Sequence, residues 1–275
     1  MSDSRPIAPF GRRSVSIVET RSLGLYQVIK VQDDAAPLVR PGQFHMLSTT
    51  VGWGGETGGR PWLGRAISFL STDGAGGIEF LVDGVGPGTH RLSSLKSGDQ
   101  LDLVGPLGNG FPEVGSSDQT KPCLVAGGIG LAPILALSQR LELDGVEHDL
   151  ILGFRNAEFA GAARDWPNAS VSTDDGSVGE QGTVIAPLTR ALDSGSRTVY
   201  ACGPPLMLEA VRALCDETNT PAWFAMEAPM ACGFGACFGC AVETKDGIVR
   251  LCVDGPVLSG SVLAGISSTG RVDAQ

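Results

Sequence analysis

Four cysteines near the C-terminus offer the clearest chemistry in this 275-residue sequence. Cys232, Cys237, Cys240 and Cys252 follow the spacing C-x4-C-x2-C-x11-C, with glycines among the first three. Thiolates bind metals, and C-x4-C-x2-C followed by a later cysteine is typical of a [2Fe–2S] cluster held by four thiolates. The glycines allow the loop to curl, so that backbone N–H groups can approach the sulfurs. The spacing therefore predicts an iron–sulfur centre that carries electrons.

Two other uses of these cysteines compete with this interpretation. Structural zinc usually needs two C-x2-C pairs, whereas this segment contains one. A disulfide framework is typical of secreted chains, but the N-terminal stretch MSDSRPIAPFGRRS lacks the apolar core of a signal peptide. A non-enzymatic, zinc-stapled binding module would be colourless, whereas a protein with an iron–sulfur cluster and a flavin is brown and bleaches on reduction.

Composition excludes several classes of function. A net charge of −10 argues against binding nucleic acid through its phosphates, although backbone N–H groups can still hold a nucleotide cofactor. The 42% hydrophobic content and 39 glycines fit a packed globular protein with many tight turns. No apolar run reaches the length of a membrane span, so no membrane association is expected. Free cysteines, a predicted iron–sulfur cluster and no export signal together predict a cytoplasmic protein.

The elements that must position this chemistry fall into three segments. Residues 1–112 contain short apolar runs separated by turn signals, which predict a small closed antiparallel β-barrel. Residues 113–225 alternate strand-like and helix-like runs, which predict an α/β domain with a parallel sheet covered on both faces. Residues 226–275 hold the cysteine loop and little else, so they are expected to form a small cluster-binding domain. The predicted fold class is therefore multi-domain β and α/β.

Two glycine motifs in the middle segment suggest a nucleotide site. Gly127, Gly128, Ile129 and Gly130 follow a buried strand and precede a helix, where backbone N–H groups and the helix dipole favour a pyrophosphate. The motif is not the G-x-G-x-x-G fingerprint, and an ordinary β–α turn competes with the nucleotide interpretation. A second motif, Cys202-Gly203-Pro204, ends another strand and should lie beside the first at the carboxyl edge of the sheet. The pair of motifs favours nucleotide binding, with Cys202 in the wall of a nicotinamide pocket rather than as a small buried hydrophobe. Arg155 could meet a 2′-phosphate or point into solvent, so NAD and NADP both stay open.

The barrel segment contains two weaker motifs. Arg65-Ala66-Ile67-Ser68 offers a guanidinium fork for a diphosphate and a hydroxyl for a flavin edge. Gly88-Thr89 offers close backbone approach and a second hydroxyl. Taken alone, these motifs read as a surface ion-pair partner and a hairpin turn.

Together the motifs resemble a known family. PGQF, RAIS, VGPGT, VAGGIGLAP, LGFRN, STDDGSVGEQGTV and YACGPPLML occur in the order found in ferredoxin–NAD(P)H reductase-like flavoproteins. The ending, MACGFGACFGC followed by CVDGPVL, resembles the electron-transfer subunits of class 1B dihydroorotate dehydrogenases. The resemblance runs from Pro41 to Leu258, nearly the whole chain.

The resemblance implies roles for individual residues. FAD would be bound by three stretches: Arg65, Ala66, Ile67 and Ser68; Leu81, Val82 and Asp83; and Gly88 and Thr89. The four cysteines would be the [2Fe–2S] ligands. Two departures matter: Ala66 stands where the family usually has proline, and Asp83 stands where it has a basic or neutral residue. An acidic side chain cannot pair with a phosphate, so Asp83 is expected to serve through its backbone.

The resemblance also implies the reaction and the partner. Electrons from the FMN-containing catalytic subunit of dihydroorotate dehydrogenase would pass through the cluster and FAD to NAD+, in de novo pyrimidine (UMP) biosynthesis. The family expectation is a heterotetramer of two catalytic and two electron-transfer subunits. The alternative keeps the cofactors but changes the partner: a small FAD/[2Fe–2S] subunit of an NAD(P)H-dependent ferredoxin reductase or sulfhydrogenase. Hydride transfer is cofactor chemistry, so no catalytic acid or base is expected.

Overall fold

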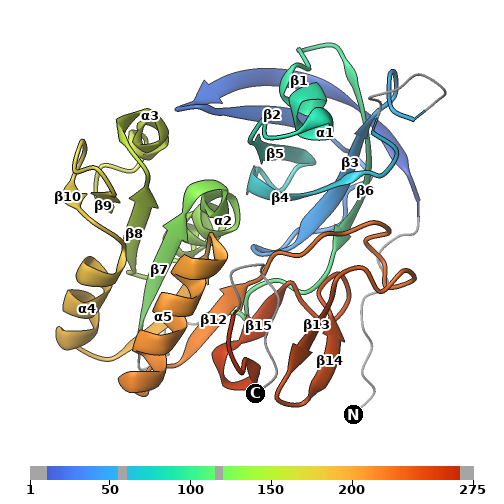
Figure 1. Ribbon diagram of the computed structural model, residues 1–275. Helices are drawn as coiled ribbons and strands as arrows, with labels where there is room; N and C mark the ends of the chain where they lie inside the picture. The colour runs from blue at the N-terminus through green and yellow to red at the C-terminus, as the bar shows by residue number, and fades with distance from the viewer. Residues whose placement is uncertain (1–10, 55–60, 115–119, 267–275) are drawn as a thin grey trace.

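An antiparallel barrel forms the N-terminal part of the protein. The computed structural model describes residues 11–54, 61–114 and 120–266. The barrel strands are β1 (Arg13–Leu23), β2 (Tyr26–Gln32), β3 (Phe44–Thr49), β4 (Arg65–Thr72), β5 (Gly77–Val82) and β6 (Gln100–Leu107). They pair in the closed order β1-β2-β5-β4-β3-β6, which confirms the predicted barrel. A short helix, α1 (Pro87–Ser93), follows β5 and contains Gly88 and Thr89, so the hairpin turn expected there is wrong (Figure 1).

The middle of the chain forms a mainly parallel sheet. Its strands are β7 (Lys121–Gly127), β8 (Asp149–Phe154), β9 (Ser170–Thr173), β10 (Glu180–Gln181), β11 (Arg197–Cys202) and β12 (Ala222–Ala225). The helices that follow them are α2 (Leu131–Leu143), α3 (Ala157–Ala160), α4 (Ile185–Asp193) and α5 (Pro205–Glu217), with 3-10 turns η1 (Gly128–Gly130) and η2 (Gly161–Ala163). The sheet order β10-β9-β8-β7-β11-β12 confirms the predicted α/β architecture.

Alternate residues of β7 show why both faces of this sheet are covered. Cys123 and Val125 point into one apolar cluster, together with side chains of α4 and α5. Leu124 and Ala126 point into another cluster, which contains most of α2. This period of two is the side-chain alternation of a strand buried on both faces. Helix α2 also contacts β4, so it lies between the sheet and the barrel.

The C-terminal segment is more structured than the sequence suggested. It contains the hairpin β13 (Ala241–Thr244) with β14 (Gly247–Arg250), the strand β15 (Val257–Ser259) and the 3-10 turn η3 (Gly260–Val262). Strand β15 pairs antiparallel with β12 and becomes the edge of the seven-stranded sheet. The cysteine loop therefore leaves the sheet at β12 and returns to it at β15. The residue boundaries of the three domains stay a prediction.

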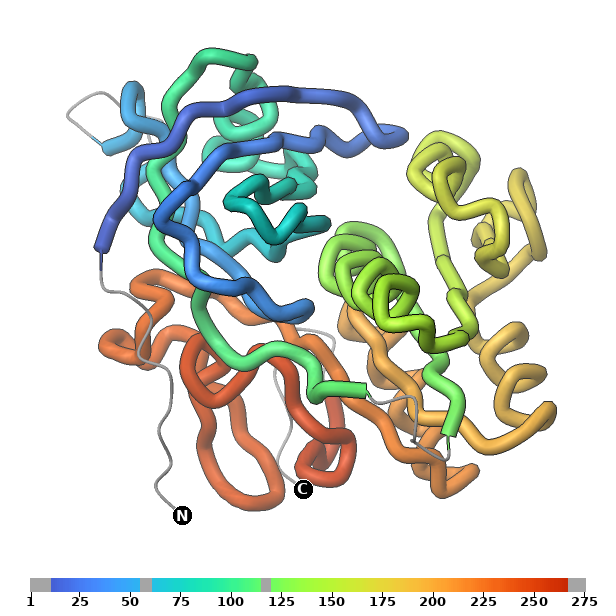
Figure 2. Tube along the Cα trace, turned by 180° about the vertical axis from the view of Figure 1, so that it is seen from behind, coloured from blue at the N-terminus to red at the C-terminus, as the bar shows by residue number. Residues whose placement is uncertain are grey.

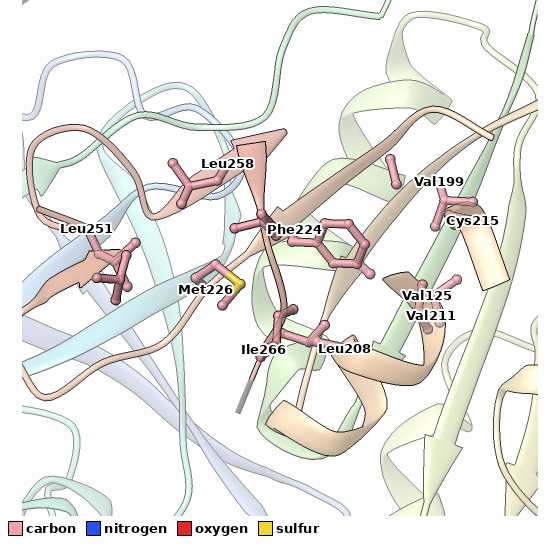
Figure 3. Close-up of a cluster of buried hydrophobic side chains, with 14 of the residues drawn as sticks. Val125, Val199, Leu208, Val211, Cys215, Phe224, Met226, Leu251, Leu258 and Ile266 are labelled. Atoms are coloured by element: carbon pink, nitrogen blue, oxygen red, sulfur yellow. The ribbon is translucent and has the colours of Figure 1, made fainter. Parts of the chain in front are cut away.

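Apolar packing joins the C-terminal segment to the rest of the molecule. Figure 3 shows Phe224 of β12 among Met226, Leu208 and Ile266, with Leu258 and Leu251 nearby. The same cluster includes the barrel residues Phe44 and Met46, so one core continues through all three parts of the chain. Figure 2 shows the C-terminal segment against both the barrel and the sheet.

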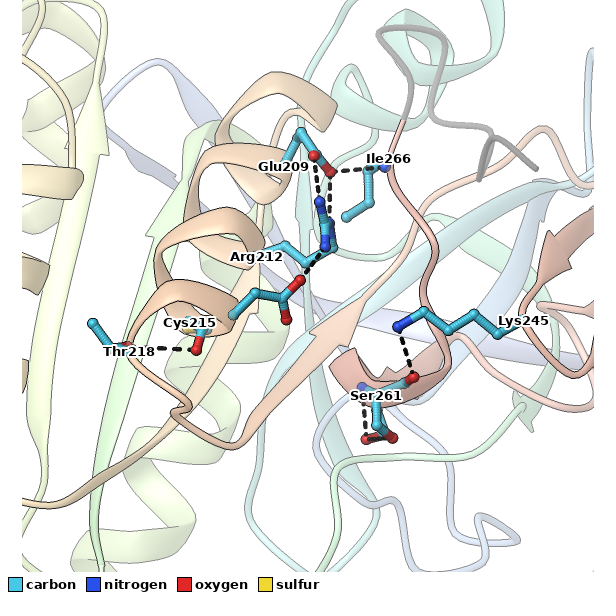
Figure 4. A network of polar contacts seen from close by, with 9 residues as sticks. Glu209, Arg212, Cys215, Thr218, Lys245, Ser261 and Ile266 are labelled. Carbon is cyan, nitrogen blue, oxygen red and sulfur yellow. Dashed lines mark hydrogen bonds and ion pairs between the residues drawn. The ribbon is translucent and has the colours of Figure 1, made fainter. Parts of the chain in front are cut away.

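Polar contacts hold the end of the described chain in place. The Ile266 N–H donates to Glu209 Oε2 over 2.8 Å, and Glu209 Oε1 lies 2.7 Å from Arg212 Nη2 (Figure 4). Lys245 Nζ donates to the Ser261 carbonyl over 3.1 Å. These bonds attach the segment to α5 and to the β13–β14 hairpin. None of the helices in the described part of the chain is long and apolar enough to cross a membrane.

A buried histidine gives the barrel a pH-dependent stability. His45 of β3 is 0% exposed, and neither ring nitrogen has a hydrogen-bond partner. Its ring packs edge-on against Phe80 with centroids 5.2 Å apart. Burial, assisted by the charge of Arg13, lowers the pKa of His45 from 6.5 to about 3. The folded protein therefore keeps this imidazole neutral at pH values where the unfolded chain protonates it.

We expect the free energy of unfolding to fall as pH drops below 6.5, by about 1.4 kcal/mol per pH unit, until the pH approaches the folded pKa. The unfolded chain binds one more proton than the folded chain in this window, which favours unfolding. Urea titrations between pH 7.5 and 5 would measure the slope. The variant His45→Leu should flatten it by that amount, while the control His90→Gln, at an exposed position, should not. An equal slope in wild type and His45→Leu would contradict this assignment.

Candidate functional site

A cleft of about 310 Å³ lies where the three parts of the chain meet. Its lining from the barrel is Gly42, Phe44, Ala66, Ile67, Ser68, Leu81, Asp83, Val85 and Thr89. Its lining from the sheet domain is Ile129, Ala132, Pro133, Cys202 and Ala225. The C-terminal segment contributes Met226, Glu227, Ala228, Met230 and Pro256. Eight residues singled out from the sequence thus face one space: Ala66, Ile67, Ser68, Leu81, Asp83, Thr89, Ile129 and Cys202.

Arg65 and Gly88 lie side by side just outside this lining. A Cβ on Gly88 would come within 2.5 Å of Arg65 Nε, so a larger residue at position 88 would displace the guanidinium. Arg65 also donates to the Leu63 carbonyl over 2.6 Å and lies over the Trp53 ring, 5.6 Å from its centroid. These contacts hold the guanidinium beside the start of α1, where it could meet a diphosphate.

Two other residues of the barrel motifs differ in what they can offer. Val82 is 1% exposed and packs in the barrel core, so only its backbone is available to a ligand. The Thr89 hydroxyl accepts hydrogen bonds from the N–H groups of Val85 and Gly86, both over 3.0 Å. It therefore shapes the turn that begins α1, in addition to lining the cleft.

The two glycine motifs of the sheet domain meet at its carboxyl edge, as predicted. Strands β7 and β11 are parallel neighbours, with Cys202 opposite Ala126. A Cβ on Gly130 would lie 2.4 Å from the Cys202 carbonyl oxygen, and one on Gly203 would lie 3.0 Å from the Gly127 nitrogen. Gly128 has a φ of +55° with open space around it, at the N-terminal end of α2. Pro204 precedes α5 and contacts the Gly127 position. The backbone at this edge is therefore open to an anionic ligand.

Glu227 is a cleft residue that the sequence analysis missed. Glu227 is exposed as a whole residue, and the protein packed around its carboxyl group raises the pKa of Glu227 above its usual value. Burial, followed by the charge of Glu227, also raises the pKa of the Cys202 thiol far above its usual value. The Glu227 carboxyl and the buried Cys202 thiol therefore share one wall of the cleft. Glu227 comes directly after β12, at the carboxyl edge of the sheet, and this position is the one feature of the sequence that could have placed it in the cleft.

The four predicted ligand cysteines come together as two pairs. In the described residues, no three His, Cys, Asp or Glu side chains converge tightly enough to hold a single metal ion. Instead, the Cys237 side chain is a hydrogen-bond partner of the Cys232 thiol, and the Cys240 side chain is one of the Cys252 thiol. The charge of Cys232 also reaches Cys252, so the two pairs are neighbours. A two-iron cluster needs two ligands on each iron, so two pairs of thiols match it better than one mononuclear site. All seven cysteines of the chain are free.

Backbone N–H groups surround these sulfurs. Gly235 donates to Cys252 Sγ over 3.1 Å, and Cys252 donates to Cys240 Sγ over 3.4 Å. Gly239 donates to Cys237 Sγ over 3.4 Å. Burial raises the pKa of Cys232, but N–H groups that include those of Phe234 and Cys237 outweigh it and bring that pKa down to about 6. Donors aimed at the sulfurs suit thiolates and the charge of a cluster.

Positive φ angles explain why glycines lie between the cysteines. Gly233 has φ +80°, and a Cβ there would lie 2.6 Å from Met46 Cγ of the barrel. Gly235 has φ +87°, and a Cβ there would lie 2.7 Å from Val253 Cγ2. The loop therefore lies directly against β3. Met46 pairs with Ala66, which lines the cleft, so a single strand pair separates the cleft from the cysteine loop.

A larger cavity, of about 930 Å³, lies at the opposite edge of the sheet. Its lining includes Lys121, Asp149 and Arg197 at the starts of their strands, where both cations bind the Asp149 carboxylate. None of the residues singled out from the sequence for a cofactor role lines it. The smaller cleft is therefore the candidate functional site.

Comparisons with known proteins agree with this geometry. Residues 227–264 match the model of the iron-sulfur cluster binding domain of dihydroorotate dehydrogenase B. A dihydroorotate dehydrogenase B (NAD(+)) electron transfer subunit from Clostridium acetobutylicum is 38% identical over 87% of this chain and 95% of its own length. The subunit of the same name from a Streptococcus pneumoniae strain is 36% identical over 73% of this chain and 83% of its own length.

Solved structures share the fold. A chain of the NADH-dependent reduced ferredoxin-NADP oxidoreductase, described in terms of flavin-based electron bifurcation, aligns with a TM-score of 0.78 and 26% identity over 92% of this chain and 90% of its own. Phthalate dioxygenase reductase aligns with a TM-score of 0.58 and 16% identity over 90% and 95% of the two chains, which shows the fold alone. The whole-length relatives and the matched iron–sulfur model establish that the chain belongs to the family of dihydroorotate dehydrogenase B (NAD(+)) electron transfer subunits.

Proposed function

We propose that this chain transfers electrons from the FMN-containing catalytic subunit of a dihydroorotate dehydrogenase, through a [2Fe–2S] cluster and FAD, to NAD+ in de novo pyrimidine biosynthesis. The observation that carries the proposal is the shared wall of the cleft and the cysteine loop. Met230 lines the cleft two residues before Cys232, and Gly233 lies against Met46. A two-electron site and a one-electron site would therefore be neighbours.

The residues of this chain divide between the three groups. Arg65–Ser68, Leu81–Asp83, Gly88 and Thr89 would hold FAD; Gly127–Gly130 and Cys202–Pro204 would hold NAD; and the four cysteines would hold the cluster. When bound, FAD exchanges a hydride with NAD and single electrons with the cluster. The chain itself binds and orients the cofactors: the glycine turns offer N–H groups to phosphates, the apolar cleft walls exclude water, and Glu227 places a carboxyl group of raised pKa in the cleft.

The surface of the cysteine loop is the expected contact for the catalytic subunit. Cys237 is exposed, and the neighbouring Phe234 and Phe238 are 47% and 59% exposed. Aromatic side chains are enriched at protein interfaces. Arg250 lies over the Phe238 ring, 5.1 Å from its centroid, and adds a cation to the same surface. The expected complex has two copies of each subunit, and the seven free cysteines favour the reducing cytoplasm.

Replacing Gly88 by alanine is expected to weaken FAD binding about tenfold, because the new methyl group would displace the Arg65 guanidinium from the diphosphate site. Alanine also favours helix α1 over glycine, so the stability of the fold should not fall. FAD titration of the deflavinated chain, followed by flavin fluorescence, would measure the change. Gly265→Ala, which adds a methyl group in open space, is the control. Unchanged FAD affinity in Gly88→Ala would contradict the placement of the diphosphate.

Native affinity purification of the full-length chain from its own cells tests the function. The eluate should contain a flavoprotein subunit and should reduce NAD+ when dihydroorotate is added. The eluate could instead contain a brown protein that oxidises NADH, has no dihydroorotate activity and carries another partner. That result would support the cofactor assignment and contradict the role in pyrimidine biosynthesis.

That second outcome defines the other candidate, an NAD(P)H-linked ferredoxin reductase subunit. The observation in its favour is the likeness over 92% of the chain to the NADH-dependent reduced ferredoxin-NADP oxidoreductase. Reduction of ferredoxin or NADP+ by the purified complex would distinguish it. The higher identity, 38% against 26%, and the matched iron–sulfur model favour the dihydroorotate assignment.

A further inference from the structure

The tip of the β1–β2 hairpin extends from the barrel to the sheet domain. Figures 1 and 2 both show it beside α3. Gly24, in the turn, has φ +60°, and a Cβ there would lie 2.7 Å from the Ala162 nitrogen. A Cβ on Gly161 would in turn lie 3.3 Å from the Gly24 Cα. The two backbones therefore touch with no side chain between them. A Cβ at position 24 would clash with the Ala162 backbone, and one at position 161 would push against Gly24.

Apolar side chains pack around the contact between the hairpin tip and the α3 segment. Leu23 and Tyr26, on either side of the turn, are 4% and 2% exposed, and they share one apolar cluster with Ala160 and Ala162. The rings of Tyr26 and Phe159 lie 6.0 Å apart at a tilt of 55°. Side chains this well buried indicate a contact packed as closely as a protein interior, not a loose interdomain surface.

Charged groups from both sides of the cleft act electrostatically on Tyr26. Burial raises the pKa of Tyr26 to about 12, with the charge of Asp83 adding to the rise and the charge of Arg155 opposing it. Asp83 follows β5 and lines the cleft, whereas Arg155 follows β8 of the sheet. The Arg155 guanidinium lies over the Phe159 ring, 5.8 Å from its centroid. This gives Asp83, which cannot pair with a phosphate, a place in the interdomain contact.

The cleft lies between this contact and a second one. At the far end, the Asn109 N–H bonds to the Gly255 carbonyl, and Asn109 bridges to Pro256, another cleft residue. In Figure 1 the hairpin lies near the top of the boundary between the barrel and the sheet, and the C-terminal segment lies near its bottom. The boundary is therefore attached at both ends, with the candidate cofactor residues in between.

We propose that the hairpin tip, Gly24 to Tyr26, is a positioning element that fixes the NAD-binding sheet against the flavin barrel, so that hydride transfer proceeds without closure of the two domains. The proposal rests on the proposed function. Hydride transfer needs reacting atoms about 3–3.5 Å apart, and a displacement of about 1 Å can cost about 100-fold in rate. A backbone contact across the boundary has no flexible side chain to absorb such a displacement.

Three glycine-to-alanine variants of the full chain, loaded with FAD and cluster, test the proposal. Gly24→Ala forces a methyl group into the Ala162 backbone, and Gly161→Ala adds one against the Gly24 Cα without a positive φ to strain. Gly74→Ala is the matched control, because Gly74 lies in another barrel turn with φ +71° and has no atom within 4 Å of the added Cβ. Stopped-flow bleaching of the flavin by NADH gives the rate of hydride transfer and its dependence on NADH concentration.

We expect Gly24→Ala to slow hydride transfer about 100-fold and Gly161→Ala about tenfold, with the KM for NADH, the FAD content and the cluster spectrum unchanged. Gly74→Ala should transfer hydride at the wild-type rate. If Gly24→Ala fails to fold, Gly161→Ala decides alone. Wild-type rates in Gly161→Ala, or an equal loss in Gly74→Ala, would overturn the proposal. Wild-type protein that does not oxidise NADH at all would overturn the proposed function instead.

Discussion

Replacing Cys240 by serine is expected to lower dihydroorotate-dependent NAD+ reduction by more than about 100-fold, while NADH oxidation by an artificial two-electron acceptor continues. Cys240 is 2% exposed, and its sulfur accepts a hydrogen bond from the Cys252 N–H. A serine hydroxyl is a poorer iron ligand than a thiolate, so the one-electron route should fail. The FAD residues belong to the barrel and the NAD residues lie at the carboxyl edge of the sheet, so both sets should keep their arrangement.

Assays of the reconstituted complex and of the isolated chain would separate the two activities, and the iron content would report the cluster. Cys215→Ala is the control, because Cys215 is equally buried but belongs to α5. It should retain iron and both activities. If Cys240→Ser lost its cluster but kept full dihydroorotate-dependent activity, electrons would not pass through the cysteine loop.

Replacing Glu227 by alanine is expected to slow NADH-driven flavin reduction by about 100-fold, the usual loss when one positioned donor is removed from an active site. The packing around its carboxyl group raises the pKa of Glu227, so this carboxyl group keeps its proton to a higher pH than a free glutamate does. It can therefore donate a hydrogen bond in the cleft. Stopped-flow measurements on the isolated chain would give the rate without contributions from the partner.

The pH dependence tests the same group by a second measurement. As pH rises through the raised pKa, Glu227 loses its proton, so the wild-type rate should fall on the alkaline side. Glu227→Gln keeps an N–H donor that does not titrate, so its rate should stay flat over that range. A wild-type alkaline limb that persists unchanged in Glu227→Gln would assign the titration to another group.

Local patterns were sufficient to predict most of the fold. The barrel strands are short runs of β-branched and aromatic residues between turns, and helices α2, α4 and α5 alternate with strands of the parallel sheet. Helix α1 was missed because its sequence, PGTHRLS, is short and begins with the proline and glycine of a turn. Strand β15 was missed because three residues are too few to show the alternation of apolar and polar side chains that marks a strand. Its pairing with β12 is a tertiary contact, which local sequence does not predict.

The candidate site was predictable to a different extent. Cysteine spacing and paired glycine turns are local signals, and the structure brings each of those groups together as expected. Glu227 has no partner at a fixed spacing, so its place in the cleft depends on where β12 ends relative to the barrel. Gly24 and Gly161 are far apart in sequence, and no local pattern in either segment predicts that their backbones touch.

The return of the chain to the sheet through β15 limits how the iron–sulfur segment can be exchanged between such reductases. The cysteine loop lies between β12 and β15, which are hydrogen-bonded neighbours in one sheet. The loop therefore cannot be removed as a separate domain at a linker. Truncation after β12 would remove the edge strand as well as the redox centre. A chimaera that transplants this centre must carry β15 with it, or the recipient sheet will expose an unpaired edge open to aggregation.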